Sequence, residues 1–125
     1  MDKKRILIVD DEAGITRTLK LYLEATGAYE VRTENQGRRA LPAAREFRPN
    51  LVLLDVVMPD IDGGTVAAEL NADAALKDIP VVFLTALVTN KEVGSQGRSI
   101  GGRPFIAKPL DPEKVIEYIE RHVKN

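Results

Sequence analysis

Three short runs of consecutive apolar residues, each followed by a polar residue, constrain the fold of this chain more than any other feature. The runs are residues 6–9, 51–54 and 81–84. A strand covered on both faces produces such a run, whereas a strand with one wet face alternates apolar and polar side chains. The sequence therefore predicts a parallel sheet with helices on both sides.

The segments between the runs are typical of amphipathic helices. Ile15, Leu19 and Leu23 recur every fourth residue after the first run, which predicts a helix with one apolar stripe. Near the carboxyl terminus, Asp111 is suited to an N-cap and Pro112 to the first position of a last helix.

Other segments complete an alternation of strands and helices. Residues 29–33 and 104–107 are expected to be strands, and Asp62 is a candidate N-cap for a helix after the second apolar run. Residues 38–47 also favour a helix, in which Pro42 should introduce a kink or shift the start. The expected order is five repeats of strand and helix.

Length and composition limit the class of protein. The 125 residues are expected to form one domain, residues 1–125. Eighteen basic against nineteen acidic residues give a net charge of −1, so direct binding to nucleic acid or to a membrane is not expected. The chain has no cysteine, which excludes thiolate chemistry, and residues 6–9 are too short for a signal peptide. We expect a cytoplasmic protein.

Polar residues stand where the predicted strands end. They are Asp10 and Asp11, then Asp55, Thr85 and Lys108. Because ligands of such sheets bind outside the carboxyl ends of the strands, these side chains are expected to meet at one edge. Taken singly, Asp11 or Thr85 could be a helix N-cap and Lys108 a solvated side chain.

The combination of groups indicates phosphoryl chemistry. Three clustered carboxylates repel one another, and a hard cation such as Mg²⁺ relieves that repulsion. A lysine and a hydroxyl can bind phosphoryl oxygens. A carboxylate can itself be the nucleophile and form an aspartyl phosphate.

The chain resembles the response-regulator receiver domain of two-component signal transduction. Four motifs carry the resemblance: residues 6–12 (ILIVDDE), 54–63 (LDVVMPDIDG), 80–86 (PVVFLTA) and 107–110 (AKPL). It implies an α/β fold of the doubly wound (βα)5, flavodoxin-like or CheY-like kind. The five parallel strands would have the order 2-1-3-4-5, with helices on both faces.

The resemblance also implies roles for the acidic residues. Asp55 would be the phosphoacceptor. The metal ligands for Mg²⁺ would be Asp10, Asp11, Asp55 itself and the backbone carbonyl of Val57.

Further roles follow from the last two motifs. Thr85 and Lys108 would bind the phosphoryl group, and Lys108 and Pro109 would be joined by a cis peptide bond. Thr85 and Phe105 would form the switch, which remodels the surface of residues 88–107 and the last helix.

Partners are implied in the same way. A histidine kinase or phosphotransfer protein would be the phosphodonor, and the chain would catalyse only its own phosphorylation and dephosphorylation. The signal would pass to a downstream protein partner or to an effector domain absent from these 125 residues. The chain would be a monomer, or a weak dimer through the switching surface.

Two features depart from the family pattern. Residues 88–104 contain Gly94, Gly97 and a Gly-Gly pair, which predict a short, weakly held helix and a mobile lead into the last strand. Val57 and Leu87 on the rim of the site are apolar. Neither can orient an attacking water, so a long-lived phosphoryl group is expected.

Three alternatives compete with this interpretation. An aspartyl-phosphate phosphohydrolase would need a second acid where Val57 stands. A docking module without phosphorylation would have lost the acceptor, the acidic pair or the lysine, and this chain keeps them all. A nucleotide-binding domain would need a glycine-rich phosphate loop after the first strand, which is absent.

Overall fold

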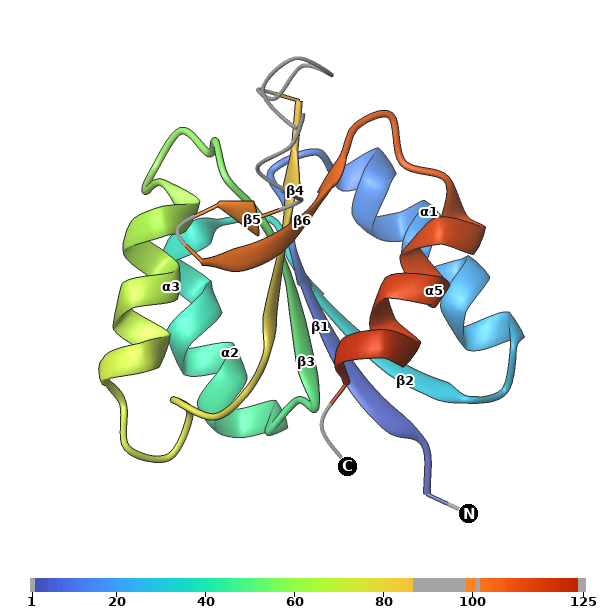
Figure 1. The fold of residues 1–125 in the computed structure, drawn as a ribbon, viewed down its shortest axis with the longest axis horizontal. Helices are drawn as coiled ribbons and strands as arrows, with labels where there is room; N and C mark the ends of the chain where they lie inside the picture. The colour runs from blue at the N-terminus through green and yellow to red at the C-terminus, as the bar shows by residue number, and fades with distance from the viewer. Residues whose placement is uncertain (1, 87–98, 101, 124–125) are drawn as a thin grey trace.

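A computed structural model describes residues 2–86, 99–100 and 102–123. In these residues, strands and helices alternate along most of the chain, as the sequence predicts (Figure 1). The elements are β1 (Lys4–Val9), α1 (Ala13–Ala25), β2 (Tyr29–Glu34), the 3₁₀ turn η1 (Gly37–Arg39), α2 (Ala40–Phe47), β3 (Leu51–Asp55), α3 (Gly63–Ala72), β4 (Val81–Thr85), β5 (Ser99–Ile100), β6 (Arg103–Ala107) and α5 (Pro112–His122).

Five parallel strands form the body of the sheet, in the order β2-β1-β3-β4-β6. This arrangement confirms the expected order 2-1-3-4-5. The strand order reverses at β1. Strand β2 lies on one side of β1, and β3 begins the second half of the sheet on its other side. In folds of this kind, that reversal point opens a crevice at the carboxyl ends of the strands.

The two-residue strand β5 was not predicted. It pairs with the start of β6 in an antiparallel hairpin and extends the sheet at that edge. Gly102 lies in the reversal with a φ of 82°, a conformation that glycine adopts without steric penalty. The prediction that no regular helix crosses the Gly-Gly pair was correct, but nothing in the sequence indicated that Ser99 and Ile100 would pair with β6. The predicted short helix and Leu87 fall within residues 87–98, outside the described part of the chain.

Alternation along the strands produces two separate cores. Helices α2 and α3 cover one face of the sheet, while α1 and α5 cover the other (Figure 1). On the strands, Leu7 and Leu54 belong to the α2–α3 side, whereas Ile8 and Leu53 belong to the α1–α5 side. All four side chains are fully buried, which explains why these strands read as continuous apolar runs.

The helix starts follow the predicted capping chemistry. Asp62 accepts a hydrogen bond from the Thr65 backbone N–H at 2.8 Å, and Asp111 accepts one from the Glu113 N–H at 3.0 Å. Pro42 shifts the start of its helix as expected, because α2 begins at Ala40 after a 3₁₀ turn and Pro42 falls in its first turn, where no N–H partner is lost.

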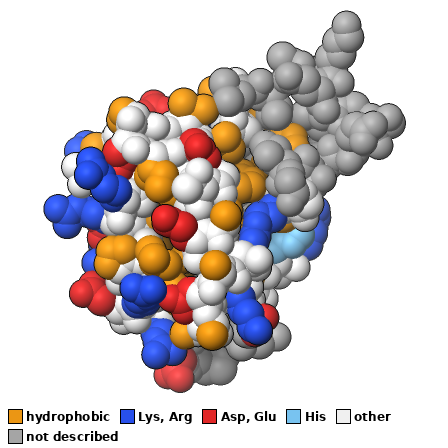
Figure 2. Space-filling view, turned by 90° about the vertical axis from the view of Figure 1, so that its left-hand side faces the viewer, with side chains coloured by type: hydrophobic (Ala, Val, Ile, Leu, Met, Phe, Trp, Pro, Cys, Tyr) orange, Lys and Arg blue, Asp and Glu red, His pale blue; other side chains and the backbone are white. Residues whose placement is uncertain are grey.

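The outer surface formed by α2 and α3 carries a mixture of side chains. Figure 2 shows Lys and Arg interspersed with Asp, Glu and apolar side chains on this face, without a continuous basic area. Among the described helices, none combines the length and apolarity needed to cross a membrane.

Candidate functional site

Strand register brings the predicted residues to the upper edge of the sheet in Figure 1. Asp55 is the last residue of β3 and lies beside Leu84, and Thr85 ends β4 beside Ala107. The backbone N–H of Lys108 donates to the carbonyl of Thr85 at 2.8 Å. These strand ends therefore place Asp55, Thr85 and Lys108 in neighbouring positions although they are far apart in sequence.

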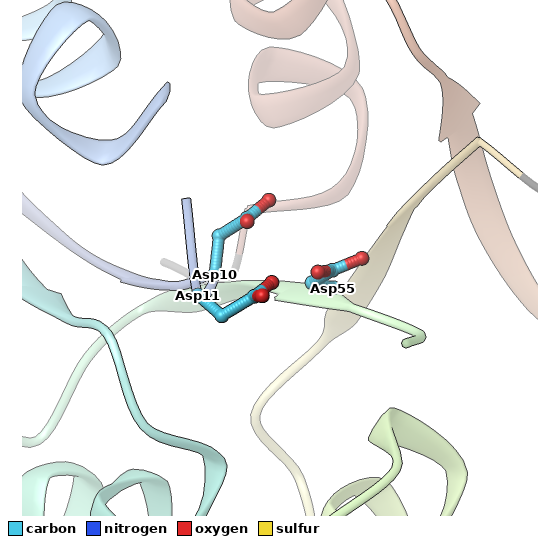
Figure 3. A group of neighbouring side chains, drawn as sticks. All are labelled: Asp10, Asp11 and Asp55. Atoms are coloured by element: carbon cyan, nitrogen blue, oxygen red, sulfur yellow. The ribbon is translucent and has the colours of Figure 1, made fainter. Parts of the chain in front are cut away.

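Three carboxylates converge at this edge. One oxygen from each of Asp10, Asp11 and Asp55 lies within 4.8 Å of the others, and Figure 3 shows the three groups turned towards a common region. Asp10 is fully buried and Asp55 is 4% exposed, whereas Asp11 is open to solvent. Asp11 is not the N-cap of α1, because that position belongs to Glu12.

Lys108 joins the cluster from the carboxyl end of β6, at the same edge of the sheet. Its Nζ lies 2.9 Å from Asp10 Oδ2, 3.0 Å from Glu12 Oε1 and 3.6 Å from Asp55 Oδ1. The Lys108–Pro109 peptide bond is cis, as predicted. One ammonium thus faces three carboxylates, and its shortest contacts are not with the predicted acceptor.

The carboxylate cluster shifts the pKa of Asp55 strongly. Burial, the charge of Asp10 and a hydrogen bond with Asp11 raise the pKa of Asp55 to about 7, against an opposing effect of Lys108. For Lys108, burial lowers the pKa, but its contacts with Asp10 and Glu12 outweigh burial and raise the pKa to about 12. In the absence of a cation, the cluster therefore holds a proton near neutral pH while the lysine stays charged.

The cluster fits a hard divalent cation. Asp10 Oδ2 is buried and accepts no well-directed hydrogen bond from the described residues, although the Lys108 ammonium is close. The three side chains offer carboxylate oxygens, which are ligands that Mg²⁺ prefers. Positive charge placed among them would relieve both the repulsion and the unsatisfied oxygen.

Backbone contacts hold the acidic residues in place. Asp10 Oδ1 accepts a hydrogen bond from the Glu12 N–H at 2.9 Å, and Asp55 Oδ1 accepts a long one from the Val57 N–H at 3.4 Å. Asn35 donates from its Nδ2 to the carbonyl of Asp10 at 2.8 Å. Sequence reasoning missed Asn35, and its signal was its place directly after β2, which pairs with β1.

The loop after Asp55 is held in place by Asp60, whose role sequence reasoning missed. Asp60 accepts hydrogen bonds from the backbone N–H groups of Gly37 and Arg38, at 3.1 and 3.0 Å. These bonds tie the loop that contains Val57 to the start of the η1 turn. The Val57 side chain itself is 53% exposed, so this rim position offers apolar surface to solvent.

The predicted switch residues occupy buried positions. Thr85 is 1% exposed at the end of β4. Phe105 is 4% exposed on β6 beside Phe83, within the core on the α2–α3 side. The structure thus places Phe105 inside the protein, two strands from the carboxylate cluster.

Comparisons with known proteins agree with this geometry. The profile of the family described as the response regulator receiver domain matches residues 6–120. The chain belongs to that family, the receiver domains of two-component response regulators.

Curated relatives and solved structures extend the match. The chain is 42% identical over 115 residues to a probable transcriptional regulator, ycf27, of Galdieria sulphuraria, and 34% identical over 122 residues to the DNA-binding response regulator MtrA of Mycobacterium leprae. These alignments cover 90% and 98% of this chain but 42% and 52% of the relatives, so the chain spans about half of their length. The chemotaxis response regulator CheY4 of Vibrio cholerae superimposes with a TM-score of 0.84 at 28% identity, covering 98% of this chain and 100% of CheY4.

Proposed function

We propose that this receiver domain accepts a phosphoryl group on Asp55 from a histidine kinase or phosphotransfer protein, with Mg²⁺ bound beside it. The observation that carries the proposal is the position of Asp55, a buried carboxylate within 4.8 Å of two others and 3.6 Å from a charged lysine. The proposed metal ligands are Asp10, Asp11, Asp55 and the carbonyl of Val57. Mg²⁺ supplies positive charge that neutralises the carboxylates and the phosphoryl oxygens.

The chain's own residues perform the transfer in one step. An ionised oxygen of Asp55 forms a bond to phosphorus as the bond from phosphorus to the donor breaks, and the donor leaves with that electron pair. The Lys108 ammonium and the Thr85 hydroxyl bind phosphoryl oxygens as charge spreads over them. The protein catalyses only its own phosphorylation and its own dephosphorylation, in which water takes the phosphoryl group from Asp55, and it has no external substrate to turn over.

The phosphorylated site acts on a surface made of β6, α5 and the residues before β6. Thr85 and Phe105 connect the two, since they lie on adjacent strands. A downstream protein or an effector domain in the same protein reads that surface. CheY4 matches over its full chain and MtrA over about half, which favours neither arrangement. In either arrangement, this domain is cytoplasmic and does not itself bind nucleic acid.

Mass spectrometry of the intact protein tests the proposal. Incubation with acetyl phosphate and Mg²⁺ should add one phosphoryl group to the wild-type chain. Asp55→Asn and excess EDTA should each abolish the gain. Asp73→Asn is the matched control, because Asp73 pairs with Arg45 at 2.9 Å, away from the cluster. Failure of a folded wild-type protein to gain the group, from acetyl phosphate or from any of a panel of histidine kinases, would contradict the proposal.

The apolar rim predicts slow loss of the phosphoryl group. Val57 is exposed beside the acceptor and has no side-chain group to orient a water molecule. Val57→Asn should shorten the lifetime of the phosphorylated protein severalfold, which the decay of the phosphorylated mass would measure. An unchanged lifetime would show that this rim position does not limit hydrolysis.

A further inference from the structure

Glu12 is a fourth acid at the site and has no role in the proposed transfer. It is the N-cap residue of α1, yet its side chain makes no capping hydrogen bond. Instead, Glu12 Oε1 lies 3.0 Å from the Nζ of Lys108, across 96 positions of sequence. The Glu12 side chain is 59% exposed, whereas the Lys108 side chain is 10% exposed. The side chain of Glu12 therefore makes no local capping bond and contacts Lys108 instead.

The contacts of the lysine are uneven. Its Nζ lies 2.9 Å from Asp10 and 3.0 Å from Glu12, but 3.6 Å from the acceptor Asp55. Asp10 is fixed by its burial and by a hydrogen bond from the Glu12 N–H. Glu12 is the exposed contact, and without it only the two buried carboxylates, Asp10 and Asp55, would share the ammonium.

We propose that Glu12 is a positioning residue that holds Lys108 away from Asp55 in the unphosphorylated protein. A phosphoryl group arriving at Asp55 competes with Glu12 for the ammonium and takes it over. This inference rests on the proposed function. Because an ion pair with an exposed partner contributes little free energy, the phosphoryl group can break the contact, and Glu12 then sets a modest threshold for phosphorylation.

The Glu12 contact should slow phosphorylation but not hydrolysis of the phosphoryl group. Lys108 leaves Glu12 before the transition state of transfer and stays on the phosphoryl group until hydrolysis. The Glu12 contact is therefore present in the unphosphorylated protein and absent from both the phosphorylated protein and the hydrolytic transition state. Glu12→Gln should accelerate phosphorylation about two- to fivefold and leave the phosphoryl lifetime unchanged.

The initial rate of phosphorylation by acetyl phosphate and Mg²⁺, followed by intact mass, tests this proposal. Glu117→Gln is the matched control: Glu117 is 62% exposed and pairs with Arg121 at 3.2 Å on α5. Its phosphorylation rate should equal that of the wild type. Decay of the phosphorylated mass, measured after removal of acetyl phosphate, gives the lifetime for each variant.

A double-mutant cycle establishes whether Glu12 acts through Lys108. In a Lys108→Met background, which keeps most of the side-chain volume, Glu12→Gln should no longer change the phosphorylation rate. An equal acceleration in that background would show that Glu12 acts only as a nearby negative charge, and would overturn the proposal.

The remaining outcomes separate the two proposals. If the wild type is phosphorylated and Glu12→Gln reacts at the same rate, the role of Glu12 is wrong and the proposed function stands. If Glu12→Gln instead shortens the lifetime, Glu12 contacts the phosphorylated state and the proposed competition is wrong. If the wild type accepts no phosphoryl group from any donor, both proposals fail together.

Discussion

The two edges of the sheet formed by the carboxyl and the amino ends of the parallel strands differ in how well their polar groups are paired. At the carboxyl edge, Lys108 faces three carboxylates (Asp10, Glu12 and Asp55), and a fourth, Asp11, lies close to Asp10 and Asp55. A buried oxygen of Asp10 lacks a well-directed hydrogen bond among the described residues. The pKa of Asp55 is raised to about 7 because its charge is poorly accommodated.

At the amino edge, polar groups are matched. The Arg5 guanidinium donates to the carbonyls of Phe47 and Arg48, at 2.8 and 2.7 Å, where α2 ends and Arg48 adopts a left-handed conformation. The Arg5 backbone exchanges two hydrogen bonds with Asn50, each of 2.7 Å. This edge therefore stabilises the fold, whereas the carboxyl edge retains unfavourable electrostatics that a cation and a phosphoryl group can relieve.

The largest expected effect comes from the loop that supports Asp55. A Cβ on Gly63 would overlap the carbonyl oxygen of Asp55 and lie 2.8 Å from the Cα of Val56. Since these are backbone atoms, Gly63→Ala should lower the free energy of unfolding by about 3 kcal/mol and slow phosphorylation. Urea unfolding measures the first effect. In the control Gly64→Ala, the added Cβ lies 3.2 Å from a side-chain oxygen of Asp62, so equal losses in the two variants would contradict this account.

Removing the acceptor charge should stabilise the cation-free protein. The pKa of Asp55 is raised above its value of 3.8 to about 7, so the folded chain binds more protons than the unfolded chain between these values. Folding stability of the wild type is then lost as pH rises from about 4 to 7. Asp55→Asn should avoid that loss and be more stable by at least about 2 kcal/mol at pH 8, and equally stable at pH 4. Thermal unfolding in EDTA measures both, and a variant less stable at pH 8 would contradict the imbalance.

A smaller effect on stability, and no effect on phosphorylation, is expected at the amino edge. Arg5→Met keeps the apolar stem but removes the hydrogen bonds to Phe47 and Arg48, and should lower the free energy of unfolding by about 1 kcal/mol. Its rate of phosphorylation should remain that of the wild type. A slower rate at full occupancy of the folded state would show that the two edges are coupled.

The sequence predicted most of the fold because burial on both faces leaves a distinctive pattern. The runs before Asp10, Asp55 and Thr85 located three strands, and the rule for parallel sheets then brought their ends together. Asp62 and Asp111 predicted helix starts because N-capping depends on local contacts.

Contacts between individual side chains of separate loops could not be predicted. Asp60 accepts a hydrogen bond from the η1 turn, and Asn35 donates one to Asp10; both join loops whose distance in space follows only from the folded sheet. The reach of Glu12 to Lys108 is of the same kind. Strand β5 is two residues long and held by pairing with β6, which is too short for any periodicity to indicate.

Thermal unfolding during a titration with Mg²⁺ tests the contrast between the edges most directly. A cation that binds the carboxyl edge of the folded chain alone should raise the free energy of unfolding by about 2.7 kcal/mol at one hundred times its dissociation constant. The wild type and Arg5→Met should gain equally, and Asp55→Asn should gain less. A wild-type stability that does not respond to Mg²⁺, or a gain that Asp55→Asn shares in full, would contradict the account.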